Sequence, residues 1–297
     1  MKKTAFIAIV GRPNVGKSTL MNHMMGEKIA IVSSKPQTTR NRIMGVLTKG
    51  EDQYVFFDTP GVHKAKNKLG DYMMKSVRSS VGSADAVILI ADAGHAPGEI
   101  EKQLIEQMKK SELPSLLVLN KIDLIQREKL AETIAAYAAL HDFNAVIPTC
   151  AESGKNVDVV LEEAAQFLYE GDWMFDEDML TDQPEKQIAA EIIREKILRT
   201  LSDEVPHGTA VVIEEFTEDK KMLRIRAEIF CEKQSHKGII VGKNGETLKR
   251  IGSYAREDME AFFGIQVYLN LWVKVKENWR DSDFNLLNFG YNKKELD

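Results

Sequence analysis

The sequence predicts an α/β protein built from two units: a larger unit with a mostly parallel sheet, then a smaller α+β unit. Up to about residue 169, short and almost continuous apolar segments alternate with amphipathic helical segments, as buried parallel strands and their crossover helices do. A Gly-rich loop of the phosphate-binding type lies between the first strand and the first helix. After an acidic stretch, the order of elements changes to α-β-β-α-α-β.

The first unit begins with an apolar strand, and a hairpin follows its first helix. Helices and buried strands then alternate to the end of the unit. Strands are expected at 6–10, 43–49, 53–57, 86–91, 115–119 and 145–147, and helices at 19–25, 68–81, 99–110, 127–140 and 157–169. Ligands of such sheets bind beyond the carboxyl ends of the strands, so we expect the site at that edge.

Residues 170–185 contain seven acidic side chains and no Lys or Arg, and we interpret them as a solvated linker. Trp173, Met174 and Phe175 within it are expected to dock onto a unit. The domains that follow from this are 1–170, a linker at 171–185, and 186–297 with a C-terminal tail. The second unit is expected to have helices at 186–201, 237–241 and 246–263 and strands at 209–216, 222–230 and 266–275.

The composition is that of a globular protein with a real core, since 43% of the residues are hydrophobic. The net charge of −5 excludes no class of partner, because a basic patch can lie in an acidic chain. The two cysteines, Cys150 and Cys231, have no metal-ligand spacing and suggest no disulfide framework. The chain has no apolar run of membrane-spanning length, and its N-terminus lacks a signal-peptide cleavage site. We therefore expect a cytoplasmic protein.

The phosphate-binding loop has the pattern G-x-x-x-x-G-K-[ST]. Its two glycines let several backbone N–H groups point at one anion. Lys17 would place its charge against the β- and γ-phosphates, and Ser18 would bring a hydroxyl to Mg²⁺. The helix that follows would direct its positive end at the phosphates. The segment predicted to bind nucleotide comprises Gly11, Arg12, Pro13, Asn14, Val15, Gly16, Lys17, Ser18 and Thr19.

Two further segments have the pattern of a phosphate sensor. Asp58-Thr59-Pro60-Gly61 follows a predicted strand, where an Asp can hold Mg²⁺ and the Gly can offer its N–H to the γ-phosphate. Residues 36–40, Pro-Gln-Thr-Thr-Arg, contain a threonine that could reach Mg²⁺ and report the γ-phosphate. Spacing alone does not choose between Thr38 and Thr39, and we favour Thr39.

Asn120-Lys121-Ile-Asp123 follows another predicted strand. The carboxylate of Asp123 has two acceptor oxygens that match the N1–H and N2–H donors of guanine, which adenine lacks. A buried carboxylate left unpaired would reject the wrong base strongly. Asn120 would brace the loop, and Lys121 would flank the base. The sequence therefore predicts selection of GTP and GDP.

Taken together, these motifs resemble the motif set of the small GTPase family over about residues 4–170, in the translation-factor-related branch. The resemblance implies a backbone contact to guanine from Cys150-Ala151, where the family usually has serine in place of cysteine. It also implies slow intrinsic hydrolysis, because Val62 replaces the water-orienting glutamine of many relatives. Asn14 is implied as a ligand of a K⁺ ion, although it could equally brace the loop. The residues expected to be catalytic are Lys17, Thr39, Gly61 and Asn14.

In the second unit, the predicted elements surround a G-x-x-G loop and resemble a type II KH domain. The resemblance implies that the loop clamps an RNA backbone and that a neighbouring apolar groove receives bases. Residues 220–256 contain ten Lys or Arg and three acids, as a single-strand-binding groove requires. The expected RNA-binding residues are Lys237, Ile239, Ile240, Val241, Gly242, Lys243, Asn244, Gly245, Lys249 and Arg250.

The pair of domains resembles the Era family of bacterial ribosome-assembly GTPases over essentially the whole chain. This implies GTP and GDP as ligands, Mg²⁺ and K⁺ as cofactors, and the 3′ end of 16S ribosomal RNA in the 30S subunit as partner. We expect a monomer that does not bind DNA; a peripheral membrane contact is not visible in the sequence. One alternative is an RNA-binding module that uses GTP as a structural ligand. A second alternative is a GTPase whose second unit is a protein-docking surface. The basic residues of 220–256 disfavour this alternative.

Overall fold

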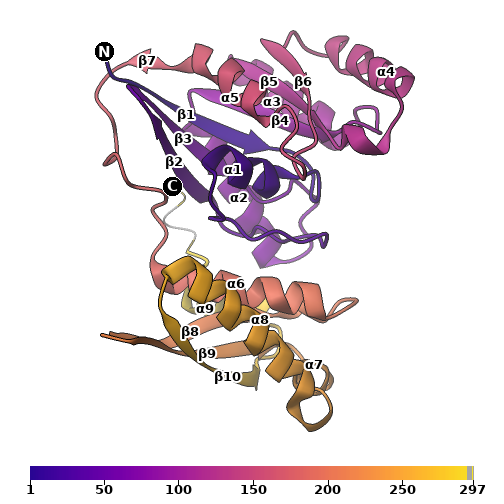
Figure 1. The fold of residues 1–297 in the computed structure, drawn as a ribbon. Coiled ribbons are helices and arrows are strands. Elements are labelled where there is room, and N and C mark those ends of the chain that lie inside the picture. The colour runs from indigo at the N-terminus through magenta and orange to yellow at the C-terminus, as the bar shows by residue number, and fades with distance from the viewer. Residues whose placement is uncertain (293–295, 297) are drawn as a thin grey trace. The chain divides into compact units, whose positions relative to one another are not determined.

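The computed structural model of the chain describes residues 1–292 and residue 296. The chain divides into two compact units. The first contains Met1–Ala65 and Tyr72–Asp182, and the second contains Lys66–Asp71 and the chain from Gln183 through the last helix (Figure 1).

The first unit is one sheet with the strand order β2-β3-β1-β4-β5-β6, and a seventh strand, β7, pairs with the start of β1. All neighbours on the main path are parallel except β2 and β3, which form an antiparallel hairpin. The strands are β1 (Lys3–Val10), β2 (Ile43–Lys49), β3 (Asp52–Asp58), β4 (Ala86–Asp92), β5 (Ser115–Asn120), β6 (Ala145–Pro148) and β7 (Tyr169–Glu170). The predicted parallel sheet is confirmed.

Helices cover both faces of this sheet, because its central strands are apolar on both sides. They are α1 (Lys17–Met25), α2 (Lys68–Gly82), α3 (Glu99–Ser111), α4 (Arg127–Ala138) and α5 (Val157–Ala164). Side chains of α1 and α5 pack on one face and those of α2, α3 and α4 on the other. The phosphate-binding loop follows β1, while Asp58 and Asn120 end β3 and β5, so the motifs meet at one edge of the sheet.

The end of the first unit differs from the prediction. The last helix stops at Ala164 and continues as a 3₁₀ turn, Ala165–Phe167, instead of reaching residue 169. The following residues pair with the start of β1, with Thr4 opposite Tyr169. Helical periodicity cannot reveal such pairing, because the partner strand lies more than 150 residues earlier in the chain.

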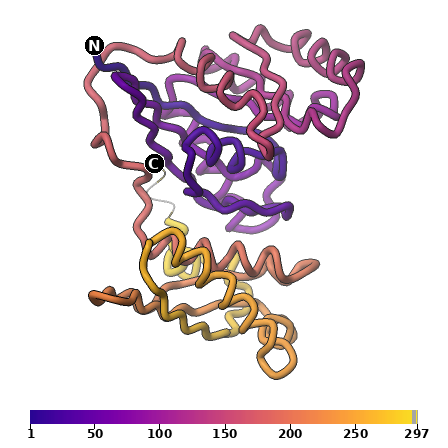
Figure 2. Tube along the Cα trace, viewed as in Figure 1, coloured from indigo at the N-terminus to yellow at the C-terminus, as the bar shows by residue number. Residues whose placement is uncertain are grey.

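Residues 171–182, which we call the strap, pack along the β2–β3 hairpin (Figure 2). The indole Nε1 of Trp173 donates a hydrogen bond to the carbonyl of Glu51 at 3.0 Å. Phe175 packs on the apolar side chains of β2 and β3, whereas Met174 is 58% exposed. Docking of Trp173 and Phe175 is therefore confirmed, and docking of the Met174 side chain is wrong. The acidic stretch is an ordered part of the first unit.

The second unit has the predicted order α-β-β-α-α-β and a sheet of order β10-β9-β8. β8 and β9 are antiparallel, and β10 is parallel to β9. Its elements are α6 (Glu185–Thr200), β8 (Ala210–Asp219), β9 (Met222–Cys231), α7 (Gln234–Val241), α8 (Glu246–Phe263), β10 (Gln266–Val275) and α9 (Asp283–Asn288). One face of the sheet packs on α6, α7 and α8 through an apolar core.

The segment predicted as a tail is ordered as far as residue 292. Trp279 is fully buried, and its indole Nε1 donates a hydrogen bond to the carbonyl of Gly208 at 2.9 Å. Its ring also contacts Phe289 and Tyr291. The tryptophan thus anchors the C-terminal segment, including α9, to the unit. The rest of the predicted tail, 293–295 and 297, lies outside the described residues.

Gln53 is the side chain that holds the strap, and its replacement tests this attachment. It is fully buried in β3; its Oε1 accepts hydrogen bonds from the N–H groups of Met174 and Phe175, and its Nε2 donates to the carbonyl of Phe175. Gln53→Ala should lower the free energy of unfolding by about 1–3 kcal/mol, because buried backbone groups lose their partners. It should also accelerate proteolysis within 171–182.

The matched control is Gln166→Ala, since Gln166 makes its hydrogen bonds at the exposed surface. Its effect on unfolding should stay within about 0.5 kcal/mol. Urea denaturation and limited proteolysis measure both variants. Equal behaviour of the two would show that Gln53 does not hold the strap.

Candidate functional site

The phosphate-binding loop requires both of its glycines. A Cβ at Gly11 would lie 2.3 Å from the carbonyl oxygen of Ile90, and one at Gly16 would lie 2.3 Å from Nδ2 of Asn120. Gly16 also has a φ of 103°, which L side chains rarely adopt. The loop therefore presses against β4 and against the end of β5, where the guanine motif begins.

Lys17 is a buried cation that forms no ion pair with a carboxylate of the described residues. Its side chain is 5% exposed, and Nζ donates hydrogen bonds to the carbonyls of Arg12 at 2.8 Å and Gly11 at 3.4 Å. Burial lowers the pKa of Lys17 to about 8, although the nearby charge of Asp58 opposes this shift. An anion bound in the loop would stabilise the charged form, so the site is prepared for phosphate.

Ser18, Thr39 and Asp58 converge from three segments. The hydroxyl of Ser18 lies 2.6 Å from Oδ2 of Asp58 and 2.9 Å from the hydroxyl of Thr39, which itself lies 3.2 Å from the same Oδ2. Burial raises the pKa of Asp58, while Lys17, Ser18 and Thr39 act in the opposite direction. The hydroxyl of Thr38 instead donates to the carbonyl of Lys35 at 2.7 Å. The geometry therefore favours Thr39 over Thr38 as a metal ligand.

The donor set fits a hard cation such as Mg²⁺. The other carboxylate oxygen of Asp58, Oδ1, is buried and accepts no hydrogen bond from the described residues. One carboxylate and two hydroxyls are oxygen ligands of the kind that Mg²⁺ takes together with water and phosphate. Within the same part of the chain, no cluster of three His, Cys, Asp or Glu side chains could hold a metal ion by itself.

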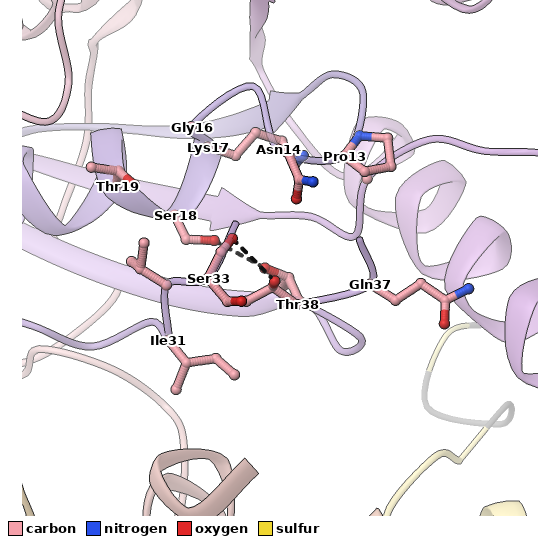
Figure 3. A pocket seen from close by; sticks show the side chains of 13 residues that line it. Pro13, Asn14, Gly16, Lys17, Ser18, Thr19, Ile31, Ser33, Gln37 and Thr38 are labelled. Atoms are coloured by element: carbon pink, nitrogen blue, oxygen red, sulfur yellow. Dashed lines mark hydrogen bonds between the residues drawn. The ribbon is translucent and has the colours of Figure 1, made fainter. Parts of the chain in front are cut away.

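A cavity of about 50 Å³ lies between the loop and the segment 31–39 (Figure 3). In Figure 3, Asn14, Lys17 and Ser18 come from the loop, and Ser33 and Thr38 come from the facing segment. The amide of Asn14 donates a hydrogen bond to the carbonyl of Ser34 at 2.6 Å, so this side chain joins the two segments. The predicted residues that line the cavity are Pro13, Asn14, Gly16, Lys17, Ser18, Thr19, Thr38, Thr39 and Gly61.

Four lining residues, Ile31, Val32, Ser33 and Gln37, were missed by the sequence prediction. They belong to an irregular segment with no periodicity. One signal was available: Asn22 lies within α1, and its side chain exchanges hydrogen bonds with the backbone of Ile29 and Ala30. An amide in an otherwise apolar stretch of a short helix marks a contact to an adjacent loop.

Gly61 approaches the phosphate-binding loop directly. A Cβ at this position would lie 2.6 Å from the Cα and N of Pro13, so a side chain has no room. The next residue, Val62, donates its N–H to the carbonyl of Gly11 at 3.0 Å and packs against the core. These contacts fix the turn after Asp58 beside the cavity.

Asn120 joins three loops, as predicted for a bracing residue. Its Nδ2 donates to the carbonyl of Val15 at 2.7 Å, and its Oδ1 accepts from the N–H of Ala151 at 2.8 Å. Lys121 pairs with Asp92 at 2.9 Å, which holds its side chain along the loop. Asp123 is exposed at the start of a 3₁₀ turn and does not cap a helix, so its carboxylate remains available for a ligand.

Several residues of the predicted nucleotide-binding set have side chains that contact other parts of the protein. Arg12 forms an ion pair with Glu101 of α3 at 2.5 Å. Thr59 is buried, and its hydroxyl donates to the carbonyl of Ile9 at 2.7 Å. The side chains of Val15, Pro60 and Cys150 are also buried, and the backbone N–H and carbonyl of Cys150 pair with Lys155. These five side chains are thus occupied or enclosed by protein, and the prediction that these residues contact nucleotide stays a prediction.

The G-x-x-G loop of the second unit connects α7 to α8. Gly242, Asn244 and Gly245 all have positive φ angles, of 74°, 52° and 79°. A Cβ at Gly242 would lie 2.2 Å from the hydroxyl of Thr247, whereas Gly245 has open space around it. The exposed backbone at the N-terminal end of α8 is therefore accessible to a ligand that carries negative charge.

A groove of about 460 Å³ begins at this loop and runs between α8 and β10. The predicted residues Gly245 and Lys249 line it; the sequence prediction missed the aromatic Tyr268, which is 53% exposed. The signal was the alternation in β10, since Tyr268 falls on the face opposite the apolar set. The residues that complete the lining are Leu248, Gly252, Ser253, Arg256, Leu269, Asn270 and Leu271.

The three apolar residues of α7 that are predicted to bind RNA point in different directions around the helix and differ in exposure. Ile239 is 50% exposed, and Val241 is partly buried, but Ile240 is fully enclosed in the core. The prediction that Ile240 contacts RNA is therefore wrong. Arg250 lines a second hollow with Tyr254, between α6 and α8, because it points about 100° away from Lys249 on the helix.

The predicted cations around the loop are available. Lys237 is partly exposed, and Lys243, Lys249 and Arg250 are exposed. None of these four cations forms a salt bridge with a residue of the described part of the chain. By contrast, Arg224, Arg226 and Arg256 pair with acids. The G-x-x-G loop and the start of α8 therefore carry positive charge that no salt bridge to a described residue neutralises.

No helix in the described residues is both long and apolar enough to cross a membrane.

Comparison with known proteins assigns both units. Residues 6–121 match the family described as 50S ribosome-binding GTPase, and residues 204–280 match the KH domain family. GTPase Era of Ruminiclostridium cellulolyticum is 49% identical over 290 residues, 97% of each chain. GTPase Era of Clostridium kluyveri is 50% identical over 292 residues, 98% of this chain and 100% of the relative.

A solved structure is similar over both units. The crystal structure of Era in complex with MgGDPNP and nucleotides 1506–1542 of 16S ribosomal RNA has a TM-score of 0.94 at 37% identity, and the match covers 98% of this chain and 99% of that chain. Because the likeness extends over nearly the full length in sequence and in fold, and includes both the GTPase and the KH domain, this chain belongs to the Era family of GTPases.

Proposed function

We propose that this chain is a GTP-hydrolysing switch that binds single-stranded RNA with its second unit, and that its target is the 3′ end of 16S ribosomal RNA during 30S assembly. The observation that carries the proposal is the convergence of Ser18, Thr39 and Asp58 above the buried Lys17. One member of this cluster comes from the phosphate-binding loop and the others from segments that respond to a γ-phosphate. A site that only stored nucleotide would not need the two responsive segments.

Mg²⁺ is proposed as the cofactor, held by Ser18, Thr39 and, through water, Asp58. When bound, it supplies positive charge between the β- and γ-phosphates. Lys17 would leave the carbonyls of Gly11 and Arg12 for the phosphates, and Gly61 would donate its N–H to the γ-phosphate. Asn14 is the proposed ligand of K⁺, a role that competes with its bond to Ser34. Hydrolysis is expected to be slow, since Val62 cannot orient water.

RNA is proposed to lie in the groove between α8 and β10, with its backbone at Gly242–Gly245. The positive φ angles there allow close approach, and Lys243 and Lys249 supply charge that no acid of the described chain neutralises. Tyr268 offers an exposed ring on which a base can stack. This arrangement favours RNA over the alternative of a protein-docking surface, because unpaired cations beside glycine backbone suit phosphate.

The 16S target is proposed from the solved Era complex, whose RNA is that segment and whose likeness covers both units. The family described as 50S ribosome-binding GTPase matches only residues 6–121, which lie within the GTPase unit. Its description therefore does not identify the RNA that the second unit binds. A cytoplasmic monomer is proposed with this function. The domain limits 1–170, 171–185 and 186–297 are also kept as a proposal, in which the strap belongs to the segment that joins the two domains.

The strap is proposed to couple nucleotide state to RNA binding. The β2–β3 hairpin begins at Ile43, four residues after Thr39, and ends at Asp58, so its outer ends adjoin the phosphate-responsive cluster. The strap bonds to this hairpin at Gln53 and through the N–H of Val46, which donates to the carbonyl of Leu180 at 2.9 Å. α6 follows the strap directly. A shift of the hairpin would therefore act on the covalent connection to the second unit.

Base selection is tested at Asp123. The wild-type chain should bind GTP and GDP and reject ATP by at least 10³-fold, because the carboxylate matches two donors of guanine. Asp123→Asn should transfer the preference to xanthosine nucleotides, since the amide then faces a carbonyl in place of N2–H. Titration with fluorescent nucleotides measures both. ATP binding as tight as GTP binding in the wild type would disprove the assignment.

The chemistry is tested at Lys17 and Asn14. Lys17→Ala should abolish hydrolysis, because the charge at the β- and γ-phosphates is lost. Hydrolysis by the wild type should be faster in K⁺ than in Na⁺ at equal ionic strength, and Asn14→Ala should remove the difference. Phosphate release under single-turnover conditions is the measurement. Equal wild-type rates in the two salts would eliminate the proposed K⁺ site and leave Asn14 its bond to Ser34.

RNA binding is tested at Gly245. Gly245→Asp has room for a side chain but places negative charge at the proposed phosphate contact, so RNA affinity should fall at least tenfold while GDP affinity stays unchanged. Gly264→Asp is the matched control, because Gly264 has a similar φ of 67°, has open space and lies at the other end of α8. Lys243→Ala should reduce the salt dependence by about 0.7 in log–log slope.

Coupling is tested by measuring RNA affinity with GDP and with a non-hydrolysable GTP analogue. The two affinities should differ in the wild type, and Gln53→Ala should reduce the difference because the strap is released. Electrophoretic mobility shift with a single-stranded 16S 3′-end oligonucleotide provides the readout. Identical affinities in both nucleotide states would mean two independent modules, even if each binds as proposed.

A further inference from the structure

Of the two residues that follow Gly61, one has a side chain able to orient water. Val62 holds the position of the usual glutamine, but its side chain is apolar and packs in the core. Its N–H is engaged with the carbonyl of Gly11. The next residue, His63, is the first after Gly61 whose side chain can accept a hydrogen bond.

The ring of His63 is fixed in one tautomer by its neighbour. Its Nδ1 lies 2.8 Å from the carbonyl oxygen of Gly61. Because a carbonyl oxygen can only accept a hydrogen bond, Nδ1 must carry the proton and donate. In the neutral ring, Nε2 then carries a lone pair and is an acceptor.

This acceptor has no partner in the structure. Nε2 of His63 is shielded from solvent and forms no hydrogen bond with any described residue. Buried polar atoms of native proteins are nearly always paired, and an exception calls for an explanation such as a catalytic role or an unseen water. Leaving the atom unpaired costs free energy, which indicates that its partner arrives with a ligand.

The position of the ring relates this acceptor to the γ-phosphate. The ring is attached to the carbonyl of Gly61, whose backbone lines the cavity and touches Pro13. This cavity, of about 50 Å³, lies against the phosphate-binding loop, where the phosphates of a nucleotide would bind. Movement of the 61–63 turn would carry Nε2 along with Gly61.

We propose that His63 is a catalytic residue of GTP hydrolysis, in which Nε2 accepts a hydrogen bond from the attacking water; this rests on the GTPase function proposed above. The water oxygen forms a bond to the γ-phosphorus as the bond from that phosphorus to the bridging oxygen breaks. The electron pair of the broken bond stays on GDP, and the protons of the water end on inorganic phosphate and solvent. His63 keeps its own proton on Nδ1 and orients the nucleophile, which is the task that glutamine performs in other GTPases.

Two amide substitutions separate this role from a merely structural one. In His63→Gln the terminal amide lies near the place of Nε2, so it can still accept from water but cannot bond to Gly61. In His63→Asn the amide lies near the place of Nδ1, so it can hold Gly61 but does not reach the water. Val62→Ala serves as a control for disturbance of the same turn.

The measurement is the single-turnover rate of hydrolysis at saturating GTP, with the Kd of GDP as a check on the site. His63→Asn should lower the rate at least tenfold, and His63→Gln should stay within about threefold of the wild type. The Kd of GDP should change little in all variants. Any result in which the Gln variant is no faster than the Asn variant overturns the proposal for His63. Failure of the wild type to hydrolyse GTP would overturn the proposed function itself.

Discussion

The first unit depends on one buried carboxylate. Asp58 ends β3 without contact to water, and its Oδ2 receives the hydroxyls of Ser18 and Thr39. A buried carboxylate is unfavourable unless hydrogen bonds and a positive charge compensate it, and here Lys17 supplies the charge. The carboxylate of Asp58 therefore fixes the relative positions of three segments: the phosphate-binding loop, residues 31–39 and the turn at Gly61. One of its oxygens still lacks a hydrogen-bond donor among the described residues.

Because the polar groups of these loops are incompletely paired, a ligand that pairs with them can shift the loops to a new position. Asp58 has one buried oxygen that accepts no hydrogen bond from the described residues, and the ammonium of Lys17 donates to backbone carbonyls. A metal ion and phosphates would satisfy both groups more strongly than the protein does, so binding energy is available to move Thr39 and Gly61. Because Thr39 lies four residues before the start of β2 and Asp58 ends β3, their movement would reach the edge of the sheet on which the strap rests.

How much the sequence predicts depends on how local the determining interactions are. The loop at Gly11–Ser18, the strands and the G-x-x-G loop follow from short patterns whose physics is contained in a few neighbouring residues. The partners of Arg12 and Thr59 could not be predicted, because they come from α3 and from β1. Ile240 fails for a different reason: three successive apolar residues in an eight-residue helix do not reveal which one faces the core.

The positions of the strap and of the C-terminal segment could not be predicted either, because they depend on contacts with residues that are distant in the sequence. Residues 171–182 read as solvated because they carry five acids and no Lys or Arg, yet Trp173 bonds to the turn between β2 and β3, and Phe175 packs on those two strands. Trp279 likewise orders a short segment that has no periodicity of its own. In both cases aromatic side chains that find partners far away in the sequence stabilise a stretch with weak local preference. An acidic stretch that contains aromatic residues is thus better treated as a candidate for docking than as a linker, and the proposed coupling of the two units rests on this docking.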